Sequence, residues 1–254
     1  MRPENYYRRL GFSPYFYAHI VFNLVRSQFA YLRNFEDIFG DMATSNWCQP
    51  FPKHTNLHQF IGQIVDSIFF EDPTERDSDD HSLRDFCEHY KINISGVDWG
   101  DEDQLFDLRL WAEYGNALDE LSDEVFHILF PDVVFCNSFN SLIARYVPQY
   151  ADAFGATDPR FTSNGRLRRV SIPQFVKKAV FHRDKGECRT CKTRLDRTLS
   201  VTLQEHYDHI VPLKAGGVND LTNIQLLCDK CNLVKSSREI GVSNLYPRAF
   251  TIKS

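Results

Sequence analysis

Four cysteines in the C-terminal third are arranged in two pairs of identical spacing. Cys188 and Cys191 form the first pair, and Cys228 and Cys231 form the second, each with two residues between its members. Two such pairs supply four thiolates, which is the ligand set of a tetrahedral structural zinc site. The 36 residues between the pairs are too many for a simple zinc ribbon. We therefore expect one Zn2+ site with a further functional segment folded between its two halves.

A second group of residues with chemical capability lies between and just after these pairs. Histidine suits the role of general base, because its unperturbed pKa of about 6.5 leaves it largely neutral at cellular pH. Carboxylate and amide oxygens are hard ligands that favour Mg2+ or Mn2+ over Zn2+. The group contains an adjacent acid and base, a glycine pair, two asparagines and two basic residues: Asp208, His209, Gly216, Gly217, Asn223, Asn232, Lys235 and Arg238. A base and a metal ion are what hydrolysis of a phosphodiester requires.

The order of these residues inside the cysteine pairs resembles the HNH nuclease superfamily, in the variant with asparagine in the last place. The resemblance covers residues 166–240. It implies a zinc-stapled ββα-metal fold and a metal-dependent endonuclease that acts on DNA. It also implies that His209 is the general base and that the side-chain amide of Asn223 ties down the loop that orients it.

The same resemblance implies where the catalytic metal and the substrate bind. Asp208 and Asn232 are expected to hold one Mg2+ or Mn2+, separate from the structural Zn2+. Lys235 and Arg238 are expected to contact the phosphates of the nucleic acid. The alternative is a non-catalytic zinc module that only binds nucleic acid. Such a module has no need of Asp208 and His209 at these positions, so the residues favour catalysis.

Other histidines compete with His209 for the role of base. His206 precedes it by three residues and could serve as a ligand or an alternative base. The register of the motif places Asp208 and His209 in the active pair, so we predict that His206 is a partly exposed strand residue. His127 and His182 fall on predicted helices and are interpreted as structural.

Charge divides the chain sharply. Residues 166–254 carry 17 Lys and Arg against 8 Asp and Glu, a net charge of +9, whereas residues 1–165 carry 12 against 26, a net charge of −14. The basic part fits a polyanionic substrate. The acidic part is interpreted as a solvated surface, as a docking surface for a protein partner, or as an intramolecular brake on the nuclease.

Periodic apolar residues predict helices through the first 150 residues. The predicted helices begin at Tyr17 and continue with Leu57–Phe70, Leu83–Tyr90, Gln104–Leu118, Leu121–Phe130 and Val133–Val147. Downstream, the pattern predicts a helix over Pro173–His182 capped by Ser171, a strand over Thr198–Gln204 leading into His206–Pro212, and a helix over Cys231–Arg238. Gly216 and Gly217 predict a tight turn.

The predicted fold class is α+β, a helical domain followed by the zinc-stapled HNH domain. The predicted boundaries are an acidic helical domain over 1–150, a linker over 151–169 and the nuclease domain over 170–254. No apolar run reaches the length of about 18 residues that a membrane span needs, and no signal peptide is evident, so we expect a cytoplasmic protein without membrane contact. Three further cysteines, Cys48, Cys87 and Cys136, are expected to be buried thiols.

The expected function is that of a metal-dependent DNA endonuclease. Its architecture is similar in plan to nucleases of prokaryotic anti-phage defence, which predicts a protein partner, an ATPase or sensor subunit, bound through residues 1–150. The alternatives are a stand-alone restriction or recombination-type HNH nuclease and the non-catalytic adaptor.

Overall fold

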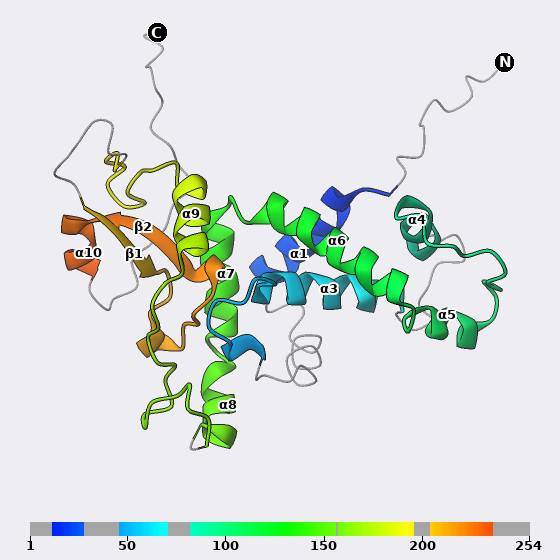
Figure 1. Ribbon diagram of the computed structural model, residues 1–254, viewed down its shortest axis with the longest axis horizontal. Coiled ribbons are helices and arrows are strands. Elements are labelled where there is room, and N and C mark those ends of the chain that lie inside the picture. The colour runs from blue at the N-terminus through cyan, green and yellow to red at the C-terminus, as the bar shows by residue number, and fades with distance from the viewer. Residues whose placement is uncertain (1–11, 28–45, 71–81, 156, 196–203, 236–254) are drawn as a thin grey trace, which may run out of the picture. The chain divides into compact units, whose positions relative to one another are not determined.

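The computed structural model describes residues 12–27, 46–70, 82–155, 157–195 and 204–235 (Figure 1). These residues are mostly helical, with one small antiparallel sheet near the C-terminal end of the described chain. The predicted α+β fold class is therefore confirmed. Within the described part of the chain no single helix is both long and apolar enough to cross a membrane, although one bent pair, Ala112–Leu129 with Val133–Ala153, meets that test of length and composition jointly.

The chain divides into two compact units. Unit 1 contains Met1–Val21 and His58–Ile128, and unit 2 contains Phe22–Leu57 and Leu129–Ser254. Segments from the first half of the sequence thus belong to the same unit as the cysteine pairs. These units differ from the predicted boundaries, and the functional division into 1–150, 151–169 and 170–254 stays a prediction.

Unit 1 is helical and its core is aromatic. Its elements are most of α1 (Pro14–Arg26) and α3 (Asn56–Phe69), then α4 (Ser82–His89), α5 (Glu102–Leu108) and nearly all of α6 (Ala112–Leu129). Phe86 lies at its centre, with its ring 4.9 Å from that of Phe69 and 5.7 Å from that of Tyr114. Offset and edge-to-face contacts of this kind add to the free energy gained by burying the rings.

The helices predicted in unit 1 are present, but one boundary was wrong. The break expected between Leu118 and Leu121 instead falls between α5 and α6. Helix α5 begins early because the Asp101 carboxylate accepts hydrogen bonds from the backbone N–H groups of Asp103 and Gln104. Residues 119 and 120 are exposed and acidic, and they continue α6 with their side chains in solvent.

Unit 2 combines helices with the sheet. Its elements are η2 (Asn46–Cys48), α7 (Val133–Ile143), α8 (Val147–Phe154), α9 (Gln174–Arg183), β1 (Glu205–His209), η3 (Leu213–Ala215), η4 (Leu221–Asn223), β2 (Ile224–Cys228) and α10 (Asp229–Lys235). Helix α7 ends before the predicted Val147, and α8 runs into the predicted linker. The predicted cap of α9 by Ser171 was wrong, because Pro173 is the capping residue and no side chain bonds the helix N-terminus.

The two strands pair in an antiparallel register that fixes which side chains share a face. Asp208 lies opposite Gln225, and His209 lies opposite Ile224. Because adjacent residues of a strand point to opposite faces, Asp208 and His209 project to different sides of the sheet. Helix α10 lies against both strands, and α9 lies against β2. The predicted strand over Thr198–Gln204 falls almost entirely outside the described residues, and the predicted helix over Cys231–Arg238 begins earlier, at Asp229.

Candidate nuclease site

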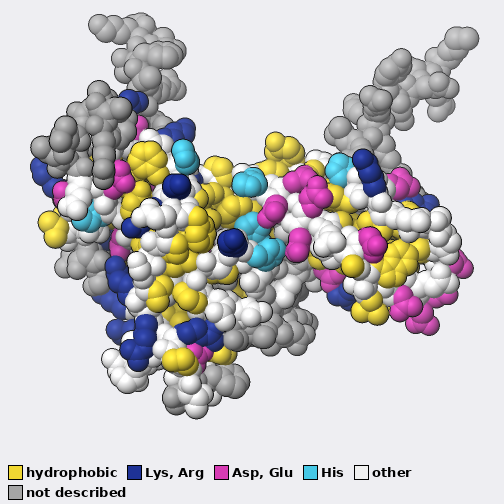
Figure 2. All heavy atoms as spheres, viewed as in Figure 1, with side chains coloured by type: hydrophobic (Ala, Val, Ile, Leu, Met, Phe, Trp, Pro, Cys, Tyr) yellow, Lys and Arg dark blue, Asp and Glu magenta, His cyan; other side chains and the backbone are white. Residues whose placement is uncertain are grey.

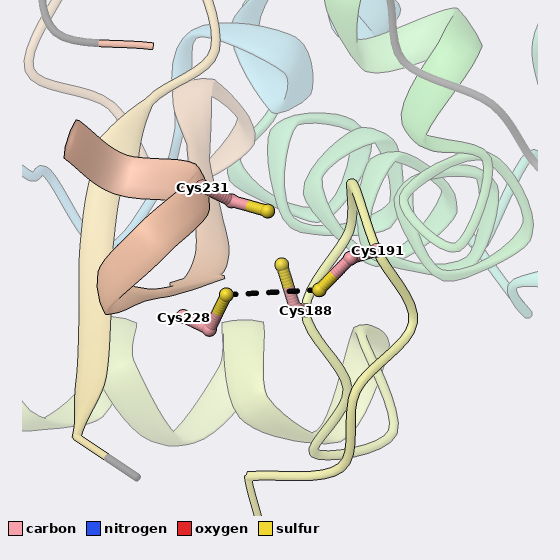
Figure 3. A group of neighbouring side chains, drawn as sticks. All are labelled: Cys188, Cys191, Cys228 and Cys231. Carbon is pink, nitrogen blue, oxygen red and sulfur yellow. Dashed lines mark hydrogen bonds between the residues drawn. The ribbon is translucent and has the colours of Figure 1, made fainter. Parts of the chain in front are cut away.

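The four cysteines predicted as zinc ligands converge on one point (Figure 3). Their Sγ atoms all lie within 4.8 Å of one another, and the Sγ atoms of Cys191 and Cys228 are 3.6 Å apart. A tetrahedral zinc with Zn–S bonds of about 2.3 Å requires sulfur atoms about 3.8 Å apart. The cluster therefore fits a Zn2+ ion in both its ligand chemistry and its spacing.

Each cysteine pair is held in place by backbone hydrogen bonds. The first pair lies in the turn after α9, where Cys188 N–H donates to the Thr193 carbonyl at 2.9 Å. Arg189 N–H donates to the Leu226 carbonyl, also at 2.9 Å, which joins this turn to β2. The second pair lies at the end of β2 and in α10. The sheet and its following helix thus bring the two halves of the site together.

A buried ion pair attaches α9 to the same sheet. The Asp184 carboxylate accepts from Arg183 Nε at 2.8 Å and from Leu226 N–H at 2.9 Å. Arg183 Nη2 donates to the Ile224 carbonyl at 2.6 Å. Both side chains are almost fully buried. This pair was not predicted, because an adjacent Arg and Asp near the end of a helix are ordinarily solvated surface residues.

His209, the predicted base, lies at the end of β1 and is 1% exposed. Its Nε2 atom is 3.1 Å from Oδ1 of Asn219. Its Nδ1 atom is buried and has no hydrogen-bond partner among the described residues. Burial lowers the pKa of His209 to about 4, so the ring is neutral at neutral pH and able to accept a proton. A buried nitrogen without a partner is costly, and a bound water or substrate is the kind of partner that it lacks.

Asn223 closes the loop that follows His209. Its Oδ1 accepts from Val211 N–H at 2.8 Å, and its Nδ2 donates to the carbonyls of Val211 and Val218 at 3.0 and 2.9 Å. These three bonds join the two ends of the loop, as expected for the middle asparagine of the motif. Gly216 adopts a φ of +87°, and a Cβ atom at Gly217 would lie 2.0 Å from the Val211 carbonyl oxygen. The predicted tight turn is thereby confirmed.

Asp208 has two cationic neighbours. Lys235 Nζ lies 2.7 Å from Asp208 Oδ2 and also donates to the His209 carbonyl at 2.6 Å. Arg169, which is largely exposed, places Nη2 3.4 Å from Asp208 Oδ1. Lys235, predicted to contact a phosphate, is 1% exposed, whereas a contact with substrate needs a side chain that reaches solvent. Burial next to a carboxylate instead gives Lys235 the geometry of a structural ion pair. Arg238, the other predicted phosphate contact, lies outside the described residues.

One face of α10 looks toward β1. Asp229 contacts His206, and Lys235 contacts Asp208. Asn232 lies three residues from each of them, so helical spacing places it on the same face of α10. Asp208 and Asn232 together offer oxygen donors of the kind that Mg2+ and Mn2+ prefer. The carboxylate retains capacity for a metal ion, because among the described residues Oδ1 is engaged only by the exposed Arg169. As predicted, His206 is partly exposed.

Segments distant in sequence hold the loop between His209 and Asn223. The buried Asp220 carboxylate accepts from the backbone N–H of Thr222 at 2.8 Å and from that of Asn56 at 3.0 Å. Asn140 of α7 donates to the Thr222 hydroxyl at 3.0 Å. Phe51 N–H donates to the Asn219 carbonyl at 2.7 Å. None of these contacts was predicted, because a motif read along the chain carries no information about partners so far away.

The two units also differ in surface charge. Figure 2 shows Lys and Arg side chains gathered over the loops beside α8 in unit 2, and Asp and Glu side chains gathered over α5 and α6 in unit 1. On the face shown, the surface charge of the two units differs in the same sense as the charge of residues 1–165 and 166–254. A basic surface on the unit with the cysteine cluster fits a nucleic-acid substrate.

Comparison with known proteins agrees with this arrangement. Residues 188–238 match the family model described as HNH endonuclease. No curated protein and no solved structure matches the chain significantly. The match begins at the first zinc-site cysteine, and the segment that it covers includes Asp208, His209, Asn223 and Asn232. HNH nucleases use divalent metals and act on nucleic acids. Residues 188–238 are therefore similar to HNH endonucleases, and the four clustered cysteines lie in the same region.

Proposed function

We propose that the protein is a metal-dependent endonuclease that hydrolyses phosphodiester bonds of DNA. The observation that carries the proposal is the setting of His209: a buried imidazole with Nε2 held by Asn219 and with Nδ1 lacking a partner among the described residues. A general base must be unprotonated and must have a free nitrogen directed at its proton donor. The unpartnered Nδ1 of His209, inside the segment that matches the HNH family, supports this role.

In this proposal each residue has a separate role. His209 Nδ1 takes the proton from the attacking water. Asp208 and Asn232 hold one Mg2+ or Mn2+, which when bound neutralises charge on the scissile phosphate and on the departing 3′ oxygen. Asn223 keeps the loop closed and so fixes the position of the ring. The four-cysteine site binds a structural Zn2+, which stabilises the fold and takes no part in the reaction.

Arg169 is the described residue best placed to receive the substrate next to Asp208. Its side chain is 66% exposed, and its contact with Asp208 is long at 3.4 Å. An arginine in this state can turn from the carboxylate to a phosphate oxygen at little cost. We assign the phosphate contact predicted for Lys235 to Arg169, since the ammonium group of Lys235 is already bound by Asp208 and His209.

The biological role is proposed from architecture alone. A helical acidic unit joined to an HNH domain is similar in plan to nuclease effectors of prokaryotic anti-phage defence. The acidic surface of unit 1 is then the docking site for an ATPase or sensor partner, in the cytoplasm. A stand-alone restriction or recombination-type nuclease is the alternative within the same chemistry.

Incubation of the full-length, zinc-loaded protein with supercoiled plasmid tests the proposal. The expected result is open-circle or linear product with added Mg2+ or Mn2+, and none when both ions are withheld. Zinc content is measured in parallel, so that loss of the structural ion is not mistaken for loss of the catalytic one. Binding of plasmid without cleavage under every metal condition would favour the non-catalytic adaptor.

A further inference from the structure

Asn219 contacts His209, and its own orientation is fixed by a second contact. Its side-chain Nδ2 lies 2.9 Å from the carbonyl oxygen of Arg168. A carbonyl can only accept a hydrogen bond, so the amide nitrogen of Asn219 must point to Arg168 and the amide oxygen must point away from it. That oxygen is the atom 3.1 Å from His209 Nε2.

The orientation of Asn219 determines which ring nitrogen of His209 carries the proton. An amide oxygen can only accept, so Nε2 must be the N–H donor of the neutral ring. The other nitrogen, Nδ1, is then unprotonated, and it is the one without a partner among the described residues. A residue without a hydrogen-bond acceptor at position 219 would leave the ring free to turn, or to place its proton on Nδ1, the nitrogen needed for catalysis.

We propose that Asn219 is a positioning residue that fixes the tautomer and the orientation of His209. The inference rests on the proposed function of His209 as general base. Asn219 does not act on the substrate; it acts through the imidazole, as the residue behind a catalytic histidine does in other hydrolases.

Asn219 is itself held firmly enough for this role. It is 3% exposed, and its carbonyl accepts from Phe51 N–H at 2.7 Å. Its neighbour Asp220 accepts from Asn56 N–H, so two consecutive residues of the loop are bound to the segment around residues 51–56. A positioning residue needs such support, because a loosely held partner would not restrict the ring.

Nitrogen-15 NMR of the histidine side chains tests the tautomer without any measurement of cleavage. The sample is the full-length, zinc-loaded protein without Mg2+ or Mn2+, and the His209 signals are assigned as those lost in His209→Ala. We expect an Nε2–H proton protected from solvent exchange and an unprotonated Nδ1. In Asn219→Leu, a change to an apolar residue of similar size, the protection should disappear. Protonation on Nδ1 in the wild type, or unchanged protection in Asn219→Leu, would overturn the proposal.

Plasmid cleavage provides the second readout. Asn219→Leu should lower kcat about 10- to 100-fold, as loss of an orienting partner does, with unchanged affinity for DNA. Asn219→Asp retains an oxygen acceptor and should recover most of the rate. Thr222→Val loosens the same loop but leaves the acceptor of His209 in place, so its rate should fall less than about threefold if orientation, not general stability, is what matters.

A double mutant separates this proposal from the proposed function. If Asn219 acts through His209, then Asn219→Leu should cause no further loss in a His209→Ala background. An equal loss in both backgrounds would assign Asn219 a role independent of the imidazole. If the wild-type protein does not cleave at all, the proposed function fails, while the NMR experiment still decides whether Asn219 fixes the ring.

Discussion

The four-cysteine cluster and the surroundings of His209 are built in different ways. The cysteines come as two local pairs, and each pair is placed by the turn or strand that contains it. The ring of His209 is instead held by Asn219, and the loop with Asn219 is held by residues as distant as Asn56, 164 positions from its partner Asp220. Local spacing can specify a metal site, whereas the orientation of a catalytic side chain depends on the tertiary structure around it.

Replacement of one cysteine of the four-cysteine cluster should cause the largest loss of stability. Cys228→Ser should abolish zinc binding and unfold unit 2, because structural zinc sites contribute roughly 10 kcal/mol or more of folding free energy. Cys87→Ser, at a buried thiol of unit 1, is the matched control and should retain zinc. Metal analysis and circular dichroism of the two variants check this. A folded Cys228→Ser protein would show that the cysteines do not form the structural site.

Removal of α7, which supports the loop from a distant part of the sequence, should cause the next largest loss of stability. Helix α7 buries several large side chains, including Phe135, Phe139 and Leu142, each worth about 1.5–3 kcal/mol of burial. A fragment of residues 166–254 lacks α7 and should unfold more readily than a fragment of residues 129–254. Thermal unfolding of the two zinc-loaded fragments measures the difference, and equal stability would contradict the contribution of α7.

A test of the proposed intramolecular brake must take account of the contacts that support the loop between His209 and Asn223. Deletion of residues 1–165 would remove the acidic half, but it would also remove α7 and the segment that binds Asp220 and Asn219. Lower activity in that fragment would report loss of support for the loop. Higher activity at low salt, where charge repulsion acts over a longer range, would still indicate that the acidic residues restrain the nuclease.

Variants of Lys235 test whether this residue forms a structural ion pair with Asp208 or contacts the substrate. Lys235→Met leaves the Asp208 carboxylate buried without its closest partner and should lower the free energy of unfolding by about 3–5 kcal/mol. The double variant Asp208→Asn with Lys235→Met should recover much of that loss. Denaturant unfolding without Mg2+ or Mn2+ measures both. Unchanged stability, together with a weaker salt dependence of DNA binding, would restore Lys235 as a phosphate contact.

Arg169 should give the smallest effect. Arg169→Ala removes one exposed cation and should reduce the slope of log Kobs against log salt concentration by about 0.9, the value for one phosphate contact. Stability should change little, since the pair with Asp208 is exposed on the arginine side. Titration of labelled duplex DNA at several salt concentrations measures the slope. An unchanged slope would remove Arg169 from the DNA-binding surface.

The features that depend on short-range spacing along the chain could be predicted from the sequence. The cysteine cluster, the adjacent Asp208 and His209 on one strand, and the turn at Gly216 and Gly217 were all expected and are all present. The burial of Lys235 was not predicted, because helical spacing indicates a face of the helix but not whether that face is buried. Asn219 was missed because asparagine in a loop is ordinarily a turn residue, and only the fold brings it to the histidine.

His209 is proposed as the general base of a metal-dependent nuclease. The most direct test of this role compares His209→Ala with His206→Ala, a histidine on the same strand that is partly exposed and bound to Asp229. Both proteins are checked for zinc content and DNA affinity, then assayed on supercoiled plasmid with Mg2+ or Mn2+. We expect His209→Ala to lose a factor of about 10² to 10⁴ in cleavage rate, while His206→Ala stays near the wild type. Robust cleavage by His209→Ala, or its loss in His206→Ala alone, would contradict the account.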